Sequence, residues 1–418
     1  MKKVKLGEIL KVKRGTSLSG DYYSTSGEKV RLTLGNFNYP NGGFKKNVSK
    51  DNIYFTGDVK PEYILKKGDI ITPLTEQVAG LLGETARIPT DGVYIQSGDI
   101  GLVIPNEKKL NHRFAYYLLP SPIVKKQLGA AAQQTKIRHT SPEKIEDCEV
   151  WIPDLYQQKK AGEILDSIND KISINNRIIS ELESLTKTIY DYWFMQFDFP
   201  DENGKPYRSS GGKMIWNDEL KREIPEGWKI KNLLSIADFE NGLACQKYRP
   251  LNNEESFPVI KIKEMENGIT NETERVSKDI PNKNIVVNGD ILFSWSATLK
   301  VIIWNGSKAG LNQHIFKVTP KKHSQKYFVF NELSSYIINF QRIAQARKTT
   351  MGHITRDHLE QSKIIIPREN VIKEFCSIVE PFYKEIAILE EEKQQLISLR
   401  NYLLPLLMNG QVKINDEY

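Results

Sequence analysis

The sequence predicts a mixed α/β (α+β) protein in which two globules are separated by two long helices. Three observations predict this fold class. Residues 1–154 and 214–367 contain short β-branched runs punctuated by Gly-rich turns. Residues 158–195, and a stretch 214 positions later, carry apolar residues in alternating steps of three and four. Short motifs also recur in the same order in both halves, which indicates an internal repeat.

Length and composition limit the class of protein. A chain of 418 residues exceeds one ordinary core, so two or three domains are expected. No apolar run reaches the roughly 18 residues of a membrane span, and Met1–Glu8 is too charged for a signal peptide. The three cysteines have no C-x-x-C spacing and the six histidines no H-E-x-x-H spacing. We therefore expect a reducing, cytoplasmic location and neither disulfides nor a metal site.

Basic charge is concentrated outside the long helices. The net charge is +7, yet residues 158–195 carry five basic and six acidic side chains. Residues 369–407 carry four basic and seven acidic side chains. The globules must therefore hold more than the whole net charge, and this favours a polyanionic partner.

The first globule, residues 1–154, should be a mixed α/β unit with one helix near 113–128. Pro120 and Pro122 are expected to break that helix. The first long helix follows at 155–198, and a polar linker rich in Gly and Ser at 199–213. The predicted seam of the helix is Leu165, Ile168, Ile172, Asn175, Ile179, Leu182, Thr186, Ile189 and Trp193.

The second globule at 214–367 leads into the second long helix at 368–412, a candidate partner for the first. Its seam is Val379, Phe382, Ile386, Leu389, Lys393, Leu396, Arg400, Leu403 and Leu407. Asn175 aligns with Leu389 and Thr186 with Arg400, so the seams are related rather than copied. Pro381 should kink or restart the second helix. On the seams alone, two unrelated amphipathic helices facing separate cores remain an alternative.

Motifs shared by the two globules favour the repeat. Their offset falls steadily from 227 to 214 along the chain, as expected if the second copy had lost a few loop residues. The matching positions are Gly15 with Gly242, 67–71 with 288–292, Thr135 with Thr349, His139 with His353, Ile145 with Leu359, and 151–153 with 365–367. The repeated unit is one globule followed by one helix.

No catalytic constellation is recognisable. The loop Gly15–Gly20 continues with Asp21 and Tyr22 where a phosphate-binding loop requires Lys and Ser or Thr, so we interpret it as a turn. The chain contains neither a dinucleotide-binding glycine motif nor a Pro-Pro pair, which the Asn/Asp-Pro-Pro-aromatic loop of amino-methylating enzymes requires. We expect a chain that is not an enzyme and holds no cofactor.

Basic, aromatic and polar residues recur together in turn-rich segments of both globules. Arg, Lys, Gln and Asn hydrogen-bond base edges, while Lys, Arg, Ser and Thr hold phosphates. For any single residue an ordinary solvated loop remains the alternative. The candidate DNA-binding residues are Arg14, Lys45, Lys46, Lys136, Arg138, His139, Lys247, Tyr248, Arg249, Arg347, Lys348, Thr349 and His353.

The junction between the halves resembles the specificity (S) subunits of type I restriction-modification systems. The similar phrases are Tyr192–Pro200 (YWFMQFDFP), Gly204–Lys213 (GKPYRSSGGK), Glu223–Trp228 (EIPEGW), Gly289–Ser294 (GDILFS), Leu311–His314 (LNQH) and Leu407–Val412 (LMNGQV).

The resemblance implies two target recognition domains, each reading half of a split DNA sequence, and a pseudo-twofold repeat. It implies that the two conserved helices pack as an antiparallel coiled-coil spacer. Members of this bacterial and archaeal family are not enzymes. They recruit two methyltransferase subunits, which bring S-adenosylmethionine and methylate adenine, and two motor-nuclease subunits, which use ATP and Mg²⁺.

Two other function classes remain open. One is a coiled-coil scaffold that joins two protein-binding modules, which explains the seams but not the basic globules. The other is an enzyme fused to its own recognition domains, which the missing cofactor and nuclease motifs oppose.

Overall fold

The computed structural model describes residues 1–39, 42–76, 80–131, 138–251, 254–270, 272–296, 298–346, 353–412 and 414, without the side chains of 131, 138 and 344–346. The chain forms two compact units. Unit 1 contains residues 1–173 and 395–418, and unit 2 contains residues 174–394. Each unit therefore includes part of both long helices, α4 (Leu155–Tyr190) and α8 (Glu369–Met408).

The strands of the described residues are short and divide evenly between the units. Unit 1 holds β1 (Lys2–Lys5), β2 (Leu10–Arg14), β3 (Tyr23–Ser24), β4 (Val30–Arg31), β5 (Tyr54–Phe55), β6 (Ile70–Pro73), β7 (Thr75–Glu76), β8 (Ala86–Arg87), β9 (Tyr94–Ile95), β10 (Ile100–Pro105), β11 (Arg138–His139) and β12 (Glu149–Ile152). Unit 2 holds β13 (Met214–Asn217), β14 (Arg222–Pro225), β15 (Lys229–Lys231), β16 (Ala237–Asn241), β17 (Ser256–Ile260), β18 (Arg275–Ser277), β19 (Ile285–Val286), β20 (Ile291–Ser294), β21 (Lys300–Ile303), β22 (Ala309–Leu311), β23 (Ile315–Pro320) and β24 (Ile364–Ile366).

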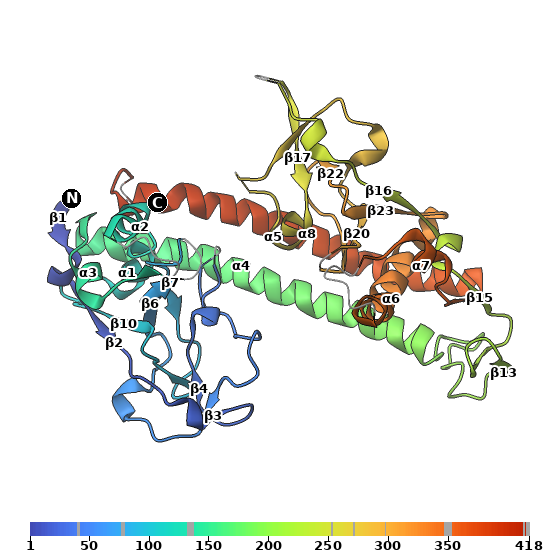
Figure 1. The fold of residues 1–418 in the computed structure, drawn as a ribbon, viewed down its shortest axis with the longest axis horizontal. Helices are drawn as coiled ribbons and strands as arrows, with labels where there is room; N and C mark the ends of the chain where they lie inside the picture. The colour runs from blue at the N-terminus through green and yellow to red at the C-terminus, as the bar shows by residue number, and fades with distance from the viewer. Residues whose placement is uncertain are drawn as a thin grey trace. The chain divides into compact units, whose positions relative to one another are not determined.

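The shorter helices flank the sheets of their own unit. They are α1 (His112–Leu118), α2 (Pro122–Ala131) and α3 (Pro142–Glu146) in unit 1, and α5 (Ile262–Asn267), α6 (Lys326–Ala346) and α7 (Arg356–Glu360) in unit 2. In unit 1, α1 begins where the Asn111 side chain accepts hydrogen bonds from two backbone N–H groups. The predicted break is confirmed, because α1 ends at Leu118 and α2 starts at Pro122. Figure 1 shows α1, α2 and α3 beside the start of α4.

Sheet topology confirms the internal repeat. The main sheet of unit 1 has the strand order β2-β10-β6-β8, and that of unit 2 has the order β16-β23-β20-β21. In both sheets all neighbouring strands are antiparallel. Each unit also has a second sheet with one parallel pair, β4 with β9 and β17 with β22. A two-stranded ladder closes each globule, β1 with β12 and β15 with β24.

Two pairs of equivalent glycines explain why the motifs recur. A Cβ at Gly15 would lie 2.2 Å from the Ser97 carbonyl oxygen, and one at Gly242 would lie 2.1 Å from that of Asn312. Only glycine permits this close approach of two backbones. The second pair, Gly68 and Gly289, has φ angles of +91° and +90°, which favour glycine.

In unit 1, α4 and α8 run antiparallel. The Gln157 side chain exchanges two hydrogen bonds with the Ile414 backbone, at 3.0 and 2.9 Å. Further along α4, Asn169 accepts a hydrogen bond from Arg400 at 3.1 Å. The residue number of the partner falls from 414 to 400 as the residue number along α4 rises from 157 to 169, as antiparallel packing requires. Leu165 is fully buried in the core cluster that also contains Leu407.

Unit 2 shows the same direction. Asn175 Nδ2 donates to Glu392 Oε2 at 2.7 Å, and the rings of Tyr190 and Phe375 lie 6.1 Å apart. The antiparallel arrangement of the two long helices therefore holds in both units. Every seam position is buried or half-buried: Leu165, Ile168, Ile172, Asn175, Ile179, Leu182, Thr186, Ile189, Trp193, Val379, Phe382, Ile386, Leu389, Lys393, Leu396, Arg400, Leu403 and Leu407.

The expectation that α8 restarts at Pro381 is wrong. The helix is one element from Glu369 to Met408. Proline removes one backbone hydrogen bond, a loss that burial of the adjoining turns can offset. Phe375 and Val379 before the proline are fully buried, and Tyr383 after it is buried as well.

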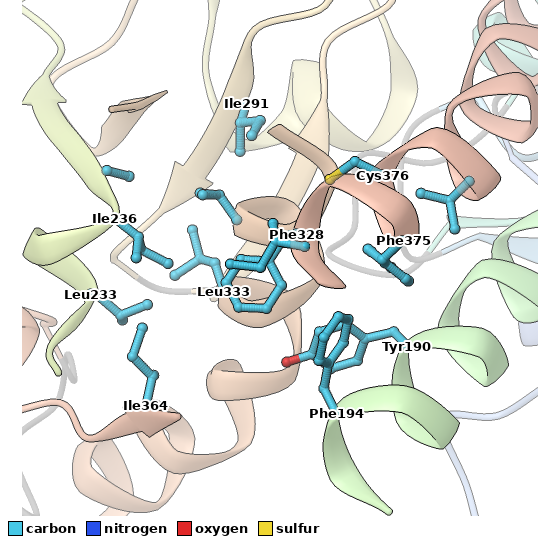
Figure 2. Packing of buried hydrophobic residues seen from close by; sticks show 14 of the residues in the cluster. Tyr190, Phe194, Leu233, Ile236, Ile291, Phe328, Leu333, Ile364, Phe375 and Cys376 are labelled. Atoms are coloured by element: carbon cyan, nitrogen blue, oxygen red, sulfur yellow. The ribbon is translucent and has the colours of Figure 1, made fainter. Parts of the chain in front are cut away.

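The core of unit 2 gathers aromatic side chains from α4, α6 and α8 (Figure 2). Phe194 lies 5.2 Å from Phe328 and 5.0 Å from Phe375, measured between ring centroids. The predicted linker at 199–213 connects α4 to β13 and is itself held in place. Phe199 stacks on Tyr207 at 4.6 Å, and both the backbone N–H and the hydroxyl of Ser209 donate to Asp198.

Candidate nucleic-acid interface

In unit 1, Arg14 lies where three segments converge. Arg14 ends β2, and its guanidinium donates to the carbonyl oxygens of Gly98 at 3.3 Å and Thr140 at 3.4 Å. His139 precedes Thr140 on β11, which pairs with β7, and its side chain is exposed. The fold thus brings together Arg14 and His139, which lie far apart in sequence. Both side chains can donate to base edges or phosphates.

Lys45 and Lys46 occupy a different part of unit 1. Both side chains are exposed, and the structure gives neither an ion pair with any described residue. The backbone of Lys45 is fixed on Asn36, which accepts from its N–H at 2.9 Å and donates to its carbonyl at 3.2 Å. The backbone of Lys45 is therefore fixed, while both ammonium groups face solvent without an ion pair to a described residue.

Unit 2 carries an aromatic and histidine cluster, here called the Trp295 cluster: Asn241, Trp295, Gln313, His314 and His353. Trp295 Nε1 donates to Asn241 Oδ1 at 3.0 Å. The indole lies 5.6 Å from the His314 ring and 5.5 Å from the His353 ring. Gln313 Nε2 lies 3.4 Å from His314 Nε2, and all five side chains of the cluster are exposed or partly exposed.

The backbone around Trp295 is pinned on both sides. Its N–H donates to the His314 carbonyl at 3.2 Å, and its carbonyl accepts from the Ile354 N–H at 3.0 Å. The backbone that carries the indole is therefore fixed between the segments that carry the two imidazoles. Amide and imidazole groups hydrogen-bond base edges, and apolar rings contact the thymine methyl group.

The Trp295 cluster stands where unit 1 has Arg14 and His139. Asn241 ends β16, as Arg14 ends β2, and the following glycines make the same close approach. The backbone N–H of Thr140 donates to the Leu74 carbonyl, as the N–H of Ile354 donates to that of Trp295. One edge of the fold thus carries different side chains in the two units.

Lys247, Tyr248 and Arg249 lie on the loop that leaves this edge. The loop begins where Leu243 forms a bridge with Asn312, next to Gln313. All three side chains are exposed, and the Tyr248 carbonyl accepts from the Ser277 N–H at 2.8 Å. The predicted residues Lys136, Arg347, Lys348 and Thr349, and the side chain of Arg138, lie outside the described residues.

Of the Trp295 cluster, the sequence singled out His353 as a candidate, while Trp295, Gln313 and His314 were not among the predicted site residues. A single Trp after an apolar strand carries no pattern of its own. The sequence signal that could have indicated this cluster was the motif Leu311–His314, which resembles the family. The backbone of Trp295 is hydrogen-bonded to its last residue.

Among the residues that the structure describes, no three His, Cys, Asp or Glu side chains gather as a metal site would require. Burial raises the pKa of the Cys148 and Cys245 thiols to about 11, which disfavours the thiolate in both. No described helix is long and apolar enough to cross a membrane.

Equivalent edges of the two units carry Arg, His, Gln and Trp side chains, which are types that contact bases and phosphates in DNA-binding proteins. The chain belongs to the family of type I restriction modification DNA specificity domains, whose model matches residues 1–184 and 225–398.

Curated relatives carry the same assignment. The chain is 21% identical over 328 residues to the type I restriction enzyme MjaIX specificity subunit of Methanocaldococcus jannaschii, which covers 75% of this chain and 72% of that protein. It is 22% identical over 409 residues to the HindI specificity subunit of Haemophilus influenzae, covering 83% of this chain and 87% of that protein.

A solved structure shares the fold. The crystal structure of the S subunit of a type I restriction-modification system from M. genitalium matches with a TM-score of 0.58 and 14% sequence identity. The match covers 97% of this chain and 96% of that one.

Proposed function

We propose that this chain is the non-catalytic DNA-recognition subunit of a type I restriction-modification complex and that it binds a bipartite target, one half-site per globule. The observation that carries the proposal is the repeated edge with non-identical side chains. Arg14 and His139 occupy it in unit 1, and the Trp295 cluster occupies it in unit 2. Two edges with the same backbone arrangement but different side chains suit two half-sites of different sequence.

The partners follow from the family. We propose double-stranded DNA, two methyltransferase subunits with S-adenosylmethionine, and two motor-nuclease subunits with ATP and Mg²⁺, in the cytoplasm of a bacterium or archaeon. Support for protein partners comes from apolar side chains that the long helices leave exposed. These are Ile174, Leu185, Ile378, Ile388, Leu399 and Tyr402.

The test is recognition by a Trp295→Leu variant in complex with the methyltransferase subunits. Leu74 occupies the equivalent place in unit 1, so leucine suits this backbone. Mapping of methylated adenines should show one half of the motif relaxed and the other unchanged, since losing a base contact relaxes one position. The matched control is Trp216→Leu, whose indole is exposed on β13 outside the cluster.

DNA retention at several salt concentrations separates this function from a protein-binding scaffold. We expect binding to the target duplex, with the methyltransferase subunits present, to weaken steeply as salt rises, because phosphate contacts release counterions. Absence of retention at low salt, with or without those subunits, would favour the scaffold. A motif altered equally in both halves by Trp295→Leu would contradict one half-site per globule.

A further inference from the structure

A chain of side-chain hydrogen bonds ties globule, α4 and α8 together in unit 1. Asn169 of α4 donates from Nδ2 to the Tyr117 hydroxyl of α1 at 2.8 Å. The Asn169 Oδ1 atom accepts from Arg400 Nη1 of α8 at 3.1 Å. Tyr117, Asn169 and Arg400 form what we call triad 1. One hydrogen-bonded group therefore comes from each of three elements that are distant in sequence.

Triad 1 is anchored on its globule side as well. The Tyr117 hydroxyl donates to Asp166 Oδ1 at 2.7 Å, and Arg87 Nη1 of β8 donates to the same oxygen at 2.7 Å. Tyr117 is buried, and burial lowers the pKa of Arg400. Hydrogen bonds between buried or partly buried side chains favour one arrangement of the elements that carry them.

Unit 2 contains the matching group, triad 2: Asn331, Tyr383 and Thr186. Asn331 Nδ2 of α6 donates to the Tyr383 hydroxyl of α8 at 2.9 Å. Thr186 of α4 lies within hydrogen-bonding reach of the Tyr383 hydroxyl and lowers its pKa, against the larger effect of burial. All three residues are buried. As in unit 1, one network joins a helix of the globule (α6) to the long helix that follows it (α8) and to the other long helix (α4).

The two triads occupy equivalent positions with their residue types exchanged. Each member of triad 2 lies 214 positions from its counterpart, the offset that relates α1 to α6 and α4 to α8. In unit 1 the globule supplies the tyrosine and the long helix the asparagine. In unit 2 the globule supplies the asparagine and the long helix the tyrosine. Both units therefore contain a Tyr–Asn hydrogen bond at the equivalent place. The residue type at each of the two positions differs between the units.

The exchange distinguishes this bond from general packing. A core contact needs only volume and apolar surface, which many residue pairs supply. In both units an asparagine amide donates to a tyrosine hydroxyl. The two side chains have exchanged elements, so each element carries a side chain of a different shape in the two units. The third member of each triad lies on the opposite long helix: Arg400 contacts Asn169, and Thr186 contacts Tyr383. This explains why the aligned seam positions 186 and 400 are both polar but carry different residues.

We propose that the two triads are positioning residues that hold each globule at a fixed angle on the helix pair and thereby restrict the number of base pairs accepted between the half-sites. This inference rests on the proposed function. A globule free to rotate on its helices could reach half-sites at several spacings, whereas a hydrogen-bonded one reaches a single spacing.

The test uses hydroxyl deletions with matched controls in the methyltransferase complex. Tyr117→Phe breaks triad 1 and Tyr383→Phe breaks triad 2 while the aromatic ring is kept. The controls are Tyr116→Phe and Tyr327→Phe, neighbouring tyrosines whose hydroxyls have no hydrogen bond to a described residue in the structure. The substrates are plasmids with both half-sites intact and the spacer lengthened or shortened by one or two base pairs.

We expect methylation at the altered spacers, relative to the natural one, to rise about tenfold in both triad variants, as loss of one to two hydrogen bonds predicts. The controls should match the wild type. Wild-type spacer selectivity in folded Tyr117→Phe and Tyr383→Phe would overturn the inference, even if both lowered the melting temperature. Thr186→Val, an almost isosteric change, asks the same question if Tyr383→Phe does not fold.

Failure of the inference is distinguishable from failure of the proposed function. If only the inference fails, the wild-type complex still methylates a bipartite motif with one spacer. If the proposed function fails, the wild type itself has no bipartite motif.

Discussion

Glu332 is a carboxyl group in the core of unit 2, on α6. Its Oε2 atom accepts from the Tyr190 hydroxyl of α4 at 2.5 Å. Burial raises the pKa of Glu332 to about 7, and the tyrosine hydrogen bond opposes this only in part. The folded protein therefore holds Glu332 protonated at mildly acidic pH.

The pKa of Glu332 predicts a pH-dependent stability. A raised folded pKa gives stability that is complete below the unfolded value of about 4.3 and is lost as pH rises through about 7. The loss should reach at most about 4 kcal/mol above neutral pH. Glu332→Gln keeps an acceptor for Tyr190 and cannot ionise, so its melting temperature should exceed that of the wild type at pH 8.5 and approach it at pH 5.

Thermal melts between pH 5 and 8.5 measure this difference, and Glu202→Gln, at an exposed carboxylate, is the control. Parallel curves for wild type and Glu332→Gln would show that Glu332 does not titrate in this range.

Single residues were predicted unevenly. Arg14, His139 and His353 came from paired basic and polar segments, and the fold brings the first two together. The Tyr–Asn bonds of the triads could not be predicted, because each joins residues 52 positions apart whose types differ between the copies. A comparison of the two halves of the sequence detects identical residues at equivalent positions. These hydrogen bonds are formed by different residues at equivalent positions.

The two long helices are the elements that the sequence predicted best. Alternating steps of three and four marked the buried stripe of each, and that stripe is buried or half-buried throughout. Pro381 misled the prediction because local propensity was weighed without the packing of the flanking turns. Asn175, fully buried and bonded to Glu392, is a polar seam residue of the kind that fixes register.

Helix length should set the unread gap between half-sites. The 36 residues of α4 extend about 54 Å at roughly 1.5 Å per residue. One heptad inserted after Ser173 in α4 and another before Gln395 in α8 keep the seams in phase. Each adds about 10.5 Å, so we expect a longer spacer in the methylated motif with both half-sites unchanged.

Sequencing of methylated adenines reads the spacer directly. A heptad in α4 alone is the control, since it misaligns the seams and should reduce methylation at every spacing. An unchanged spacer in the folded double insertion would refute the ruler role of the helices.

At the scale of the whole molecule, a repeat of globule and helix gives one chain two equivalent edges, which we propose as its two recognition surfaces. The order of the main sheet is the same in both units, while the side chains at the equivalent edge differ. The repeat was predictable because glycines at close backbone approaches and tight turns cannot vary freely. The side chains at the equivalent edge have no such constraint, which is why Arg14 and Asn241 differ although each precedes a glycine at the same close approach.

Separate globules should allow specificity to be exchanged by halves. Replacing residues 1–150 by those of a relative leaves α4, α8 and unit 2 intact. The hybrid must keep Arg87, Arg113 and Tyr117, which contact Asp166 on α4. We expect the motif to take one half-site from the donor and keep the other half-site and the spacer. A hybrid without these three side chains should lose spacer selectivity, because its contacts with α4 are broken. Changes in both half-sites of the full hybrid, detected as methylated adenines, would show that the globules do not read DNA independently.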